Sequence, residues 1–303
     1  MAKSDAMSAQ RLILIAPWFG PWPVWINLYL ESCRWNPDIA WLIPTDQDPP
    51  ENRPPNVTFL KMGFDAIIAR AQAVAGTLIT APDAYKLTDL KPLLGAMFET
   101  EISDFSHFGY TDLDIIYGQL NCEFTPERLD QYEVISSHSN MQSGHLSIFQ
   151  NSQRMRTEWR RVRGWRRAIS SPEHQSFDER SFSRRLDPRK WQPPWRRYKV
   201  LWHEMYSMPD RRQVWLDGGP PPTRMIWKQG RLTEPRNAQP QYAYLHFMLW
   251  RSNRYRYTNR VGMAPWPERD EIMHVKDWRE AAEQGFEISH DGFTLIRSNS
   301  DVT

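Results

Sequence analysis

Residues 108–118 read FGYTDLDIIYG, an apolar and aromatic run that ends in two carboxylates and then resumes. If this run is a strand leaving a sheet, side chains at i and i+2 point the same way, so Asp112 and Asp114 face one point. Carboxylates held so close repel each other unless a cation lies between them. Oxygen ligands suit Mg²⁺ or Mn²⁺, and such a metal keeps open positions for substrate phosphates. A plain surface turn has the same spacing, so both interpretations stay open on this stretch alone.

The chain upstream of the acidic pair alternates between strand and helix patterns. Residues 12–17 form an unbroken apolar run, which is typical of a strand buried on both faces. The segments that follow read as a helix, two further strands and a second helix, at 24–33, 39–46, 57–60 and 65–74. Such units predict an α/β fold with a mostly parallel sheet, whose ligands bind at the carboxyl ends of the strands. Gly20, Asp46 and the acidic pair all lie at such ends.

The remaining elements are shorter. Lys86 and Lys91 stand in a polar stretch where they would meet phosphates, and Asp89 would accept hydrogen bonds from a base or ribose. A solvated helix start explains the same residues. Beyond this stretch the predicted elements are helices at 93–101 and 128–132, strands at 133–137, 144–149, 213–217 and 224–232, and a terminal β-hairpin at 287–296 on an Asp-Gly turn.

Residues 154–199 are dense in arginine and interleaved with tryptophan, at Trp159, Trp165, Trp191 and Trp195. Such a segment fits a nucleic-acid groove, a surface facing anionic lipid, or a site for a charged acceptor. A solvated helical face laced with salt bridges has the same composition. All of these interpretations remain open from the residues themselves.

Composition bounds the class of protein. The chain has 303 residues, 40% hydrophobic and 24% charged, which is ordinary for a soluble globular protein, whereas 15 Trp is well above ordinary. The net charge of +2 is too small to argue for nucleic acid, which is not expected as a partner. Cys33 and Cys122 make no disulfide framework and indicate a reducing compartment. With no signal peptide and no membrane-spanning run, we expect a cytoplasmic protein, in peripheral contact with the inner face of the membrane at most.

Taken in order, these pieces resemble a nucleotide-sugar glycosyltransferase of the GT-A type. More closely, they resemble a largely uncharacterised bacterial family found among capsule and lipopolysaccharide sugar genes. The motifs that carry the resemblance are IAPWFGPWP (15–23), YLESC (29–33), WLIPTD (41–46), YKLTDLKP (85–92), GYTDLD (109–114), SSH (136–138), SGHLSIF (143–149), SPEH (171–174) and YLHF (244–247). The resemblance implies a Rossmann-like, mostly parallel central sheet flanked by helices, with a mixed α+β extension. Residues 11–180 would form the nucleotide-sugar-binding core, and residues 181–303 an acceptor-side extension completing the same domain.

The resemblance also implies roles for particular residues. Asp112 and Asp114 match the motif that holds Mn²⁺ or Mg²⁺ on the donor diphosphate, and His246 matches a late histidine that completes the metal shell. The donor, expected to be a UDP-sugar, would contact Trp18, Phe19, Asp46, Lys86 and Asp89. The Gly144-His145 turn would face the sugar or acceptor.

Sugar transfer by such an enzyme develops charge on a leaving diphosphate, which a metal stabilises. Inversion also needs a base near the acceptor hydroxyl. Asp178 is the expected base, with Asp114 the other catalytic residue; Glu173, His174 and Glu179 are alternatives in the same stretch. The acceptor would be a saccharide or a lipid-linked sugar of surface polysaccharide biosynthesis.

Two other functions compete with this one. The Arg/Trp-rich segment would serve a nucleic-acid or polyanion-binding module with a merely structural acidic pair. The same carboxylates would also serve a metal-dependent phosphodiesterase or nucleotidyltransferase. Such hydrolases commonly gather more acids and histidines for a second metal, whereas Tyr117, Gly118 and Gln119 follow here.

Overall fold

A computed structural model describes residues 10–187, 193, 197–209, 214–216, 218–236, 241–251 and 272–296. The strands in these ranges are β1 (Leu12–Ile15), β2 (Ile39–Thr45), β3 (Val57–Lys61), β4 (His107–Thr111), β5 (Ile115–Tyr117), β6 (Val134–Ser136), β7 (Leu146–Gln150), β8 (Val200–Trp202), β9 (Arg224–Lys228), β10 (Arg231–Thr233), β11 (Tyr244–His246), β12 (Phe286–Ser289) and β13 (Gly292–Leu295). The α-helices are α1 (Ile26–Arg34), α2 (Phe64–Ala75), α3 (Leu87–Leu90), α4 (Leu94–Met97), α5 (Pro126–Gln131), α6 (Gln153–Thr157), α7 (Trp165–Ser170), α8 (Ser183–Leu186), α9 (Met248–Arg251) and α10 (Trp278–Gln284). Shorter turns of helix are η1 (Ala84–Lys86), η2 (Lys91–Leu93), η3 (Leu120–Cys122) and η4 (Glu158–Arg161), and η5 (Phe177–Phe182) is a π-helix.

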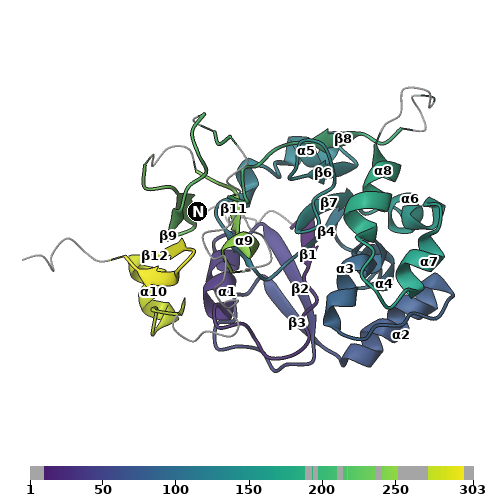
Figure 1. The fold of residues 1–303 in the computed structure, drawn as a ribbon, viewed down its shortest axis with the longest axis horizontal. Coiled ribbons are helices and arrows are strands. Elements are labelled where there is room, and N and C mark those ends of the chain that lie inside the picture. The colour runs from purple at the N-terminus through teal and green to yellow at the C-terminus, as the bar shows by residue number, and fades with distance from the viewer. Residues whose placement is uncertain are drawn as a thin grey trace, which may run out of the picture.

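A seven-stranded sheet in the order β3-β2-β1-β4-β7-β6-β8 runs through the centre of the molecule (Figure 1). The first four strands of this order pair in parallel, as do β6 and β8, whereas β7 is antiparallel to both of its neighbours. The predicted α/β class with a mostly parallel central sheet is therefore confirmed.

Both faces of the central strands β1, β2 and β4 are buried, as the unbroken apolar runs predicted. Leu12 and Leu14 of β1 enter the core on one face, which includes α1, and Ile13 and Ile15 enter the core on the other, which includes α2 and α4 (Figure 1). Burying one Leu or Ile side chain contributes about 1.5–3 kcal/mol, so the central strands carry much of the folding free energy.

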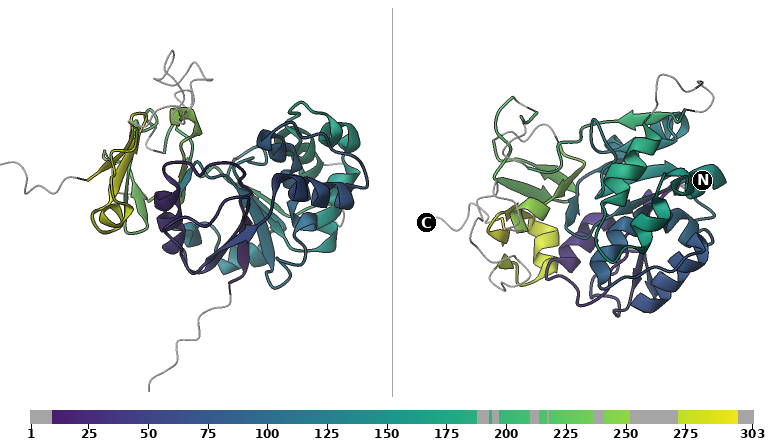
Figure 2. Two further views of the ribbon diagram at one scale, coloured as in Figure 1. Left: turned by 90° about the horizontal axis from the view of Figure 1, so that it is seen from below. Right: turned by 45° about the vertical axis from the view of Figure 1, so that its right-hand side comes forward.

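The chain leaves the central sheet after β4. β5 pairs with β11 in a two-stranded antiparallel ribbon, and a four-stranded antiparallel sheet has the order β10-β9-β12-β13. The latter sheet, with α10, lies at the end of the molecule beyond α1 (Figure 2). Trp227 Nε1 of β9 donates to the Tyr117 carbonyl of β5 at 2.9 Å, which joins the two small sheets. These sheets form the mixed extension, and the domain boundary at residue 180 stays a prediction, since β8 pairs with β6 in the central sheet.

Turn chemistry explains two of the connections. Gln229 and Gly230 both have positive φ, 48° and 75°, which suits the tight turn between β9 and β10. The predicted terminal hairpin is formed by β12 and β13, but its connection is His290-Asp291, one residue before the expected Asp-Gly turn, because Gly292 is the first residue of β13. Among the described residues, no helix combines the length and apolar character needed to cross a bilayer.

Two predicted elements differ from the structure. The strand expected at 213–217 is not formed in its described residues 214–216, where Trp215 is buried but Val214 and Leu216 are exposed. The Gly218 amide donates to the Trp215 carbonyl, so these residues form a turn. The alternation of buried and exposed side chains arises because this turn places the Trp215 ring in the core. The helix expected at 93–101 ends early, because α4 stops at Met97.

Candidate metal and donor site

The acidic pair lies where β4 ends and the chain bends toward β5. Thr111 is the last residue of β4, so Asp112 and Asp114 stand in a bend rather than on a continuing strand, which corrects the expected geometry. Leu113 is buried as expected, and its carbonyl accepts a hydrogen bond from Trp25 Nε1 at 2.8 Å. The bend therefore places both carboxylates at the end of β4 while its middle residue is fixed in the core.

His246 reaches this bend through the small ribbon. β11 pairs with β5 so that His246 lies opposite Ile115, and the Phe247 amide donates to the Asp114 carbonyl at 3.0 Å. Ligand atoms of Asp112, Asp114 and His246 all lie within 4.8 Å of one another. The structure thus brings together the three residues expected to bind metal, although this arrangement does not by itself test that role.

The chemistry of these donors fits a divalent cation. Asp114 and His246 are buried, whereas the Asp112 side chain is 33% exposed. Among the described residues neither ring nitrogen of His246 has a hydrogen-bond partner, although Nε2 lies 3.2 Å from Asp114 Oδ1. Apart from this contact with Asp114, the described residues leave the buried imidazole without a bond, and a metal ion beside the two carboxylates would satisfy it.

Two basic side chains pair with the carboxylates in this structure. Lys91 Nζ lies 2.6 Å from Asp112 Oδ1, and Arg251 Nε lies 2.7 Å from Asp114 Oδ2. Burial alone would raise the pKa of the Asp114 carboxyl, but the charges of Arg251 and His246 lower it well below its ordinary value. Asp114 is therefore a carboxylate at every pH at which the protein would work.

Asp178 and Glu179 approach the same place from η5. Lys91 Nζ donates to the Gly144 carbonyl at 2.7 Å, and the Gly144 amide donates to Glu179 Oε1 at 3.2 Å. A Cβ on residue 144 would lie 2.5 Å from Glu179 Oε1 and 3.1 Å from Asp178 Oδ2, so any larger residue would displace these carboxylates from their present positions. Burial raises the pKa of Asp178 to about 7, with Lys91 opposing and Glu179 adding to the effect. Asp178 can therefore exchange a proton near neutral pH.

His145 packs behind His246 rather than facing an open site. The two rings stack with centroids 4.1 Å apart, and His145 Nε2 lies 2.8 Å from the Tyr244 hydroxyl. Burial, followed by the charges of His246 and His138, lowers the pKa of His145 well below its ordinary value. His145 is thus a neutral ring that supports His246, whereas its expected contact with sugar or acceptor stays a prediction.

The other residues expected to contact the donor lie at the same edge of the sheet or beneath it. Trp18, beyond the end of β1, bridges to Thr45, the last residue of β2, and the Phe19 ring packs edge-on against Phe64. Asp46 Oδ1 accepts from the Gly20 amide at 3.0 Å, so it shapes the turn after β1. These placements agree with the expected strand-end site, and the donor contacts stay predictions.

Lys86 and Asp89 are placed differently from the other expected donor residues. Both side chains are almost wholly buried, at 1% and 0% exposed, and they bond to each other at 2.7 Å. A direct donor contact would require this pair to separate. The role of Lys86 and Asp89 in donor binding therefore stays a prediction, and their burial argues against it.

Sequence reasoning missed Arg251 and gave Lys91 only a general role with phosphates. Arg251 is the last residue of α9, and no local pattern in the sequence marks it as a partner of the acidic pair. The base candidates Glu173 and His174 are both exposed, unlike Asp178.

The tryptophans of the Arg-rich segment are core residues where the structure describes them. Trp159 and Trp165 are buried, with ring centroids 4.9 Å apart, so their faces are not open to bases. Arg160 and Arg166 instead lie over these rings at the surface. Trp191 and Trp195 lie outside the described residues.

Comparisons with known proteins add a family and distant structural likenesses. A family described as of unknown function, DUF6625, matches residues 14–264. A search of curated proteins finds no match. Among solved structures, the galactosyltransferase LgtC, crystallised with donor and acceptor sugar analogs, is 10% identical with a TM-score of 0.34, covering 56% of this chain and 71% of LgtC.

A second solved structure in this set is the glycosyltransferase GlyE of Streptococcus pneumoniae TIGR4. It is 11% identical with a TM-score of 0.29, and the match covers 51% of this chain and 36% of GlyE. Superpositions this loose carry no weight for function, so the assignment depends on the residues of the site.

Proposed function

This chain belongs to the DUF6625 family, and we propose that it is a metal-dependent glycosyltransferase that moves a sugar from a nucleotide-sugar donor to an acceptor. The observation that carries the proposal is the group formed by Asp112, Asp114 and the buried His246 ring at the end of β4, whose ligand atoms lie within 4.8 Å of one another. The donor is a UDP-sugar, and the acceptor is a saccharide or lipid-linked sugar of bacterial surface polysaccharide. The sugar transfer takes place in the cytoplasm, at or near the inner face of the membrane.

Asp112, Asp114 and His246 would hold Mn²⁺ or Mg²⁺. When bound, the metal stabilises the negative charge that develops on the departing diphosphate. Lys91 and Arg251 add positive charge on either side of the pair. Both are held in place by the carboxylates, so they are oriented before the donor arrives and lose little conformational freedom when it binds.

Asp178 is the proposed base that takes a proton from the acceptor hydroxyl. It is buried near Lys91 and Gly144, and its pKa of about 7 places its proton exchange at working pH. At pH values above 7 it is mostly ionised and ready to accept. Transfer with inversion therefore depends on Asp178, and its rate rises with pH through this range.

The proposal is tested by thermal unfolding with UDP, GDP or CMP, each with and without Mn²⁺. A ligand at 100 times its Kd stabilises the folded state by about 2.7 kcal/mol, which raises the melting temperature measurably. We expect the largest rise with UDP and Mn²⁺ together, and none in Asp114→Asn. If UDP with Mn²⁺ gives no rise in the wild-type protein, the proposal is wrong.

Neither competing function gains support from the site. The described residues hold one group of three metal-ligating side chains, whereas a two-metal phosphodiesterase would gather more around the pair. A nucleic-acid groove would need exposed aromatic faces, and the described tryptophans of the Arg-rich segment are buried.

A further inference from the structure

Lys86 is a buried lysine whose ammonium group is fully occupied. Its side chain is 1% exposed, and Nζ lies 2.7 Å from Asp89 Oδ2. The same Nζ donates to the carbonyls of Ala168 at 3.0 Å and Glu173 at 3.1 Å. An ammonium has three protons to donate, and here all three have protein acceptors, so none remains for a ligand.

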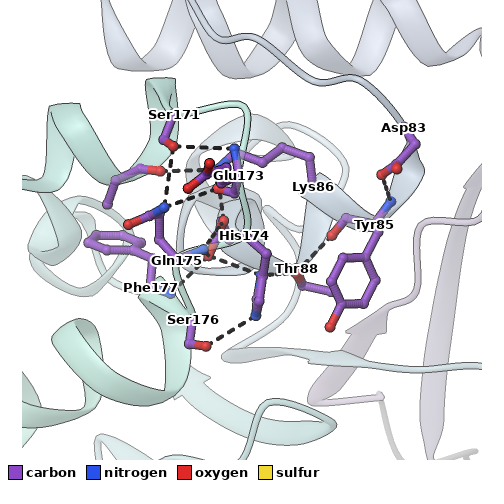
Figure 3. A network of polar contacts seen from close by, with 12 residues as sticks. Asp83, Tyr85, Lys86, Thr88, Ser171, Glu173, His174, Gln175, Ser176 and Phe177 are labelled. Atoms are coloured by element: carbon purple, nitrogen blue, oxygen red, sulfur yellow. Dashed lines mark hydrogen bonds and ion pairs between the residues drawn. The ribbon is translucent and has the colours of Figure 1, made fainter. Parts of the chain in front are cut away.

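Asp89 is occupied in the same way. Its oxygens accept from the backbone N–H of Gln175 at 3.1 and 2.9 Å and from the backbone N–H of Phe177 at 2.9 Å, in addition to Lys86 Nζ. The carboxylate is 0% exposed. A base or ribose would therefore have to break protein bonds to reach it. The pair is a clamp that holds the backbone between α7 and η5, as Figure 3 shows around Lys86, Gln175 and Phe177.

A second layer of contacts covers the clamp from outside. His174 Nδ1 lies 3.0 Å from Thr88 Oγ1, and its Nε2 lies 3.1 Å from Ser176 Oγ (Figure 3). The Tyr85 ring packs on the His174 ring at 5.0 Å. Ser176 has a φ of 49°, a left-handed conformation that a serine adopts only when its neighbours hold it there. The segment is thus held in one strained conformation immediately before η5.

What this segment positions is the start of η5. Phe177 is bonded to Asp89 and is followed directly by Asp178, which lies against the position of a Cβ on Gly144. Gly144 in turn contacts Lys91, which pairs with Asp112. A shift of the segment would therefore move Asp178 relative to the metal ligands.

We infer that Lys86 and Asp89 are positioning residues that fix Asp178 in the site, rather than ligands of the nucleotide donor. This inference rests on the proposed function for what Asp178 does once it is placed. It separates two roles that the sequence motif at 85–92 does not separate. A donor ligand sets the affinity for the nucleotide, whereas a positioning pair sets the turnover of an already bound donor.

The test compares Asp89→Asn and Lys86→Gln with the wild-type protein and with Glu31→Gln. Glu31 is a buried carboxylate on α1 paired with the partly exposed Arg34, so its variant controls for the loss of a buried carboxylate charge. The measurements are the Kd for UDP with Mn²⁺ by calorimetry, kcat for release of UDP from UDP-sugar, and amide hydrogen exchange at Gln175 and Phe177. Lys86→Gln retains Asp89 and its backbone bonds, so it serves if Asp89→Asn does not fold.

We expect both variants to speed amide exchange at Gln175 and Phe177, to leave the Kd within about threefold, and to lower kcat by about tenfold or more, since small misplacements of a catalytic group are costly. Glu31→Gln should leave all three values near wild type. A Kd raised more than about tenfold with unchanged kcat would make the pair donor ligands and overturn the inference. Faster exchange with unchanged kcat and Kd would overturn it as well.

If wild-type protein binds no UDP with Mn²⁺, the proposed function fails separately. The positioning role is then decided by the carboxyl ¹³C resonance of Asp178. A resonance that moves in Asp89→Asn but not in Glu31→Gln supports the clamp, and one that moves in neither overturns it.

Discussion

Replacing Asp114 by asparagine removes one negative charge from the most buried point of the acidic pair. The carboxylate lies 2.7 Å from Arg251 Nε, and the two side chains are 8% and 32% exposed. Removing one partner of a fully buried pair costs about 3–5 kcal/mol. Because the guanidinium keeps about a third of its surface in water, it recovers part of that hydration, and we expect a loss of about 2–3 kcal/mol.

This loss should lower the melting temperature by roughly 3–5 °C for a chain of this size. The same variant should weaken Mn²⁺ binding by at least about tenfold, because an amide oxygen replaces a carboxylate ligand. Differential scanning calorimetry and isothermal titration calorimetry measure the two effects.

The stability effect carries a pH signature. Since the folded-state pKa of Asp114 is lowered, its contribution is fully present above the unfolded value near 4 and declines as pH falls below it. The difference between wild type and Asp114→Asn should therefore shrink in acid. Asp48→Asn is the matched control, because Asp48 pairs with Lys61 at the surface and is 94% exposed. Mn²⁺ affinity within twofold of wild type in Asp114→Asn, or equal losses in both variants, would refute the metal assignment.

Three further outcomes follow from the site. His246→Ala should weaken Mn²⁺ binding by about tenfold in calorimetry, and an unchanged affinity would leave His246 as a core residue only. Asp178→Asn should become more stable than wild type as pH rises from about 4 to about 7, by up to about 4 kcal/mol, because ionising Asp178, whose pKa is raised, destabilises the folded wild-type protein. Denaturant titrations at pH 4.5 and 8 measure the difference in unfolding free energy between the two proteins, and equal differences at the two pH values would contradict this. Gly144→Ala should lower the melting temperature by a few degrees, as a clash of about 1–3 kcal/mol predicts, whereas Gly63→Ala, with open space at its Cβ, should not.

The central sheet could be predicted because its signal is local. In β1 and β2 alternate side chains enter two different cores, so the strands appear in the sequence as unbroken apolar runs. The acidic pair was visible for the same reason, since it directly follows β4. The prediction of a strand at 213–217 was wrong because, of residues 214–216, only Trp215 is buried. A single buried ring between exposed neighbours gives the same apolar pattern as an alternating strand.

The candidate site itself depends on contacts between distant parts of the chain. His246 reaches Asp114 only through the pairing of β11 with β5, and its role came from a family resemblance rather than from local pattern. Arg251 meets Asp114 across 137 residues and Lys91 meets Asp112 across 21, and nothing in either neighbourhood announces the pairing. The Lys86–Asp89 pair, three residues apart on one helical turn, was the contact most open to prediction.

The pairing of β5 with β11 also gives the site an order of assembly during synthesis. Both aspartates leave the ribosome with the first half of the chain, whereas their histidine partner follows only when residue 246 has been made. A nascent chain that stops before β11 carries the acidic pair without its third ligand. Tight metal binding would therefore report that the chain has been translated past β11 and has folded back onto its own beginning.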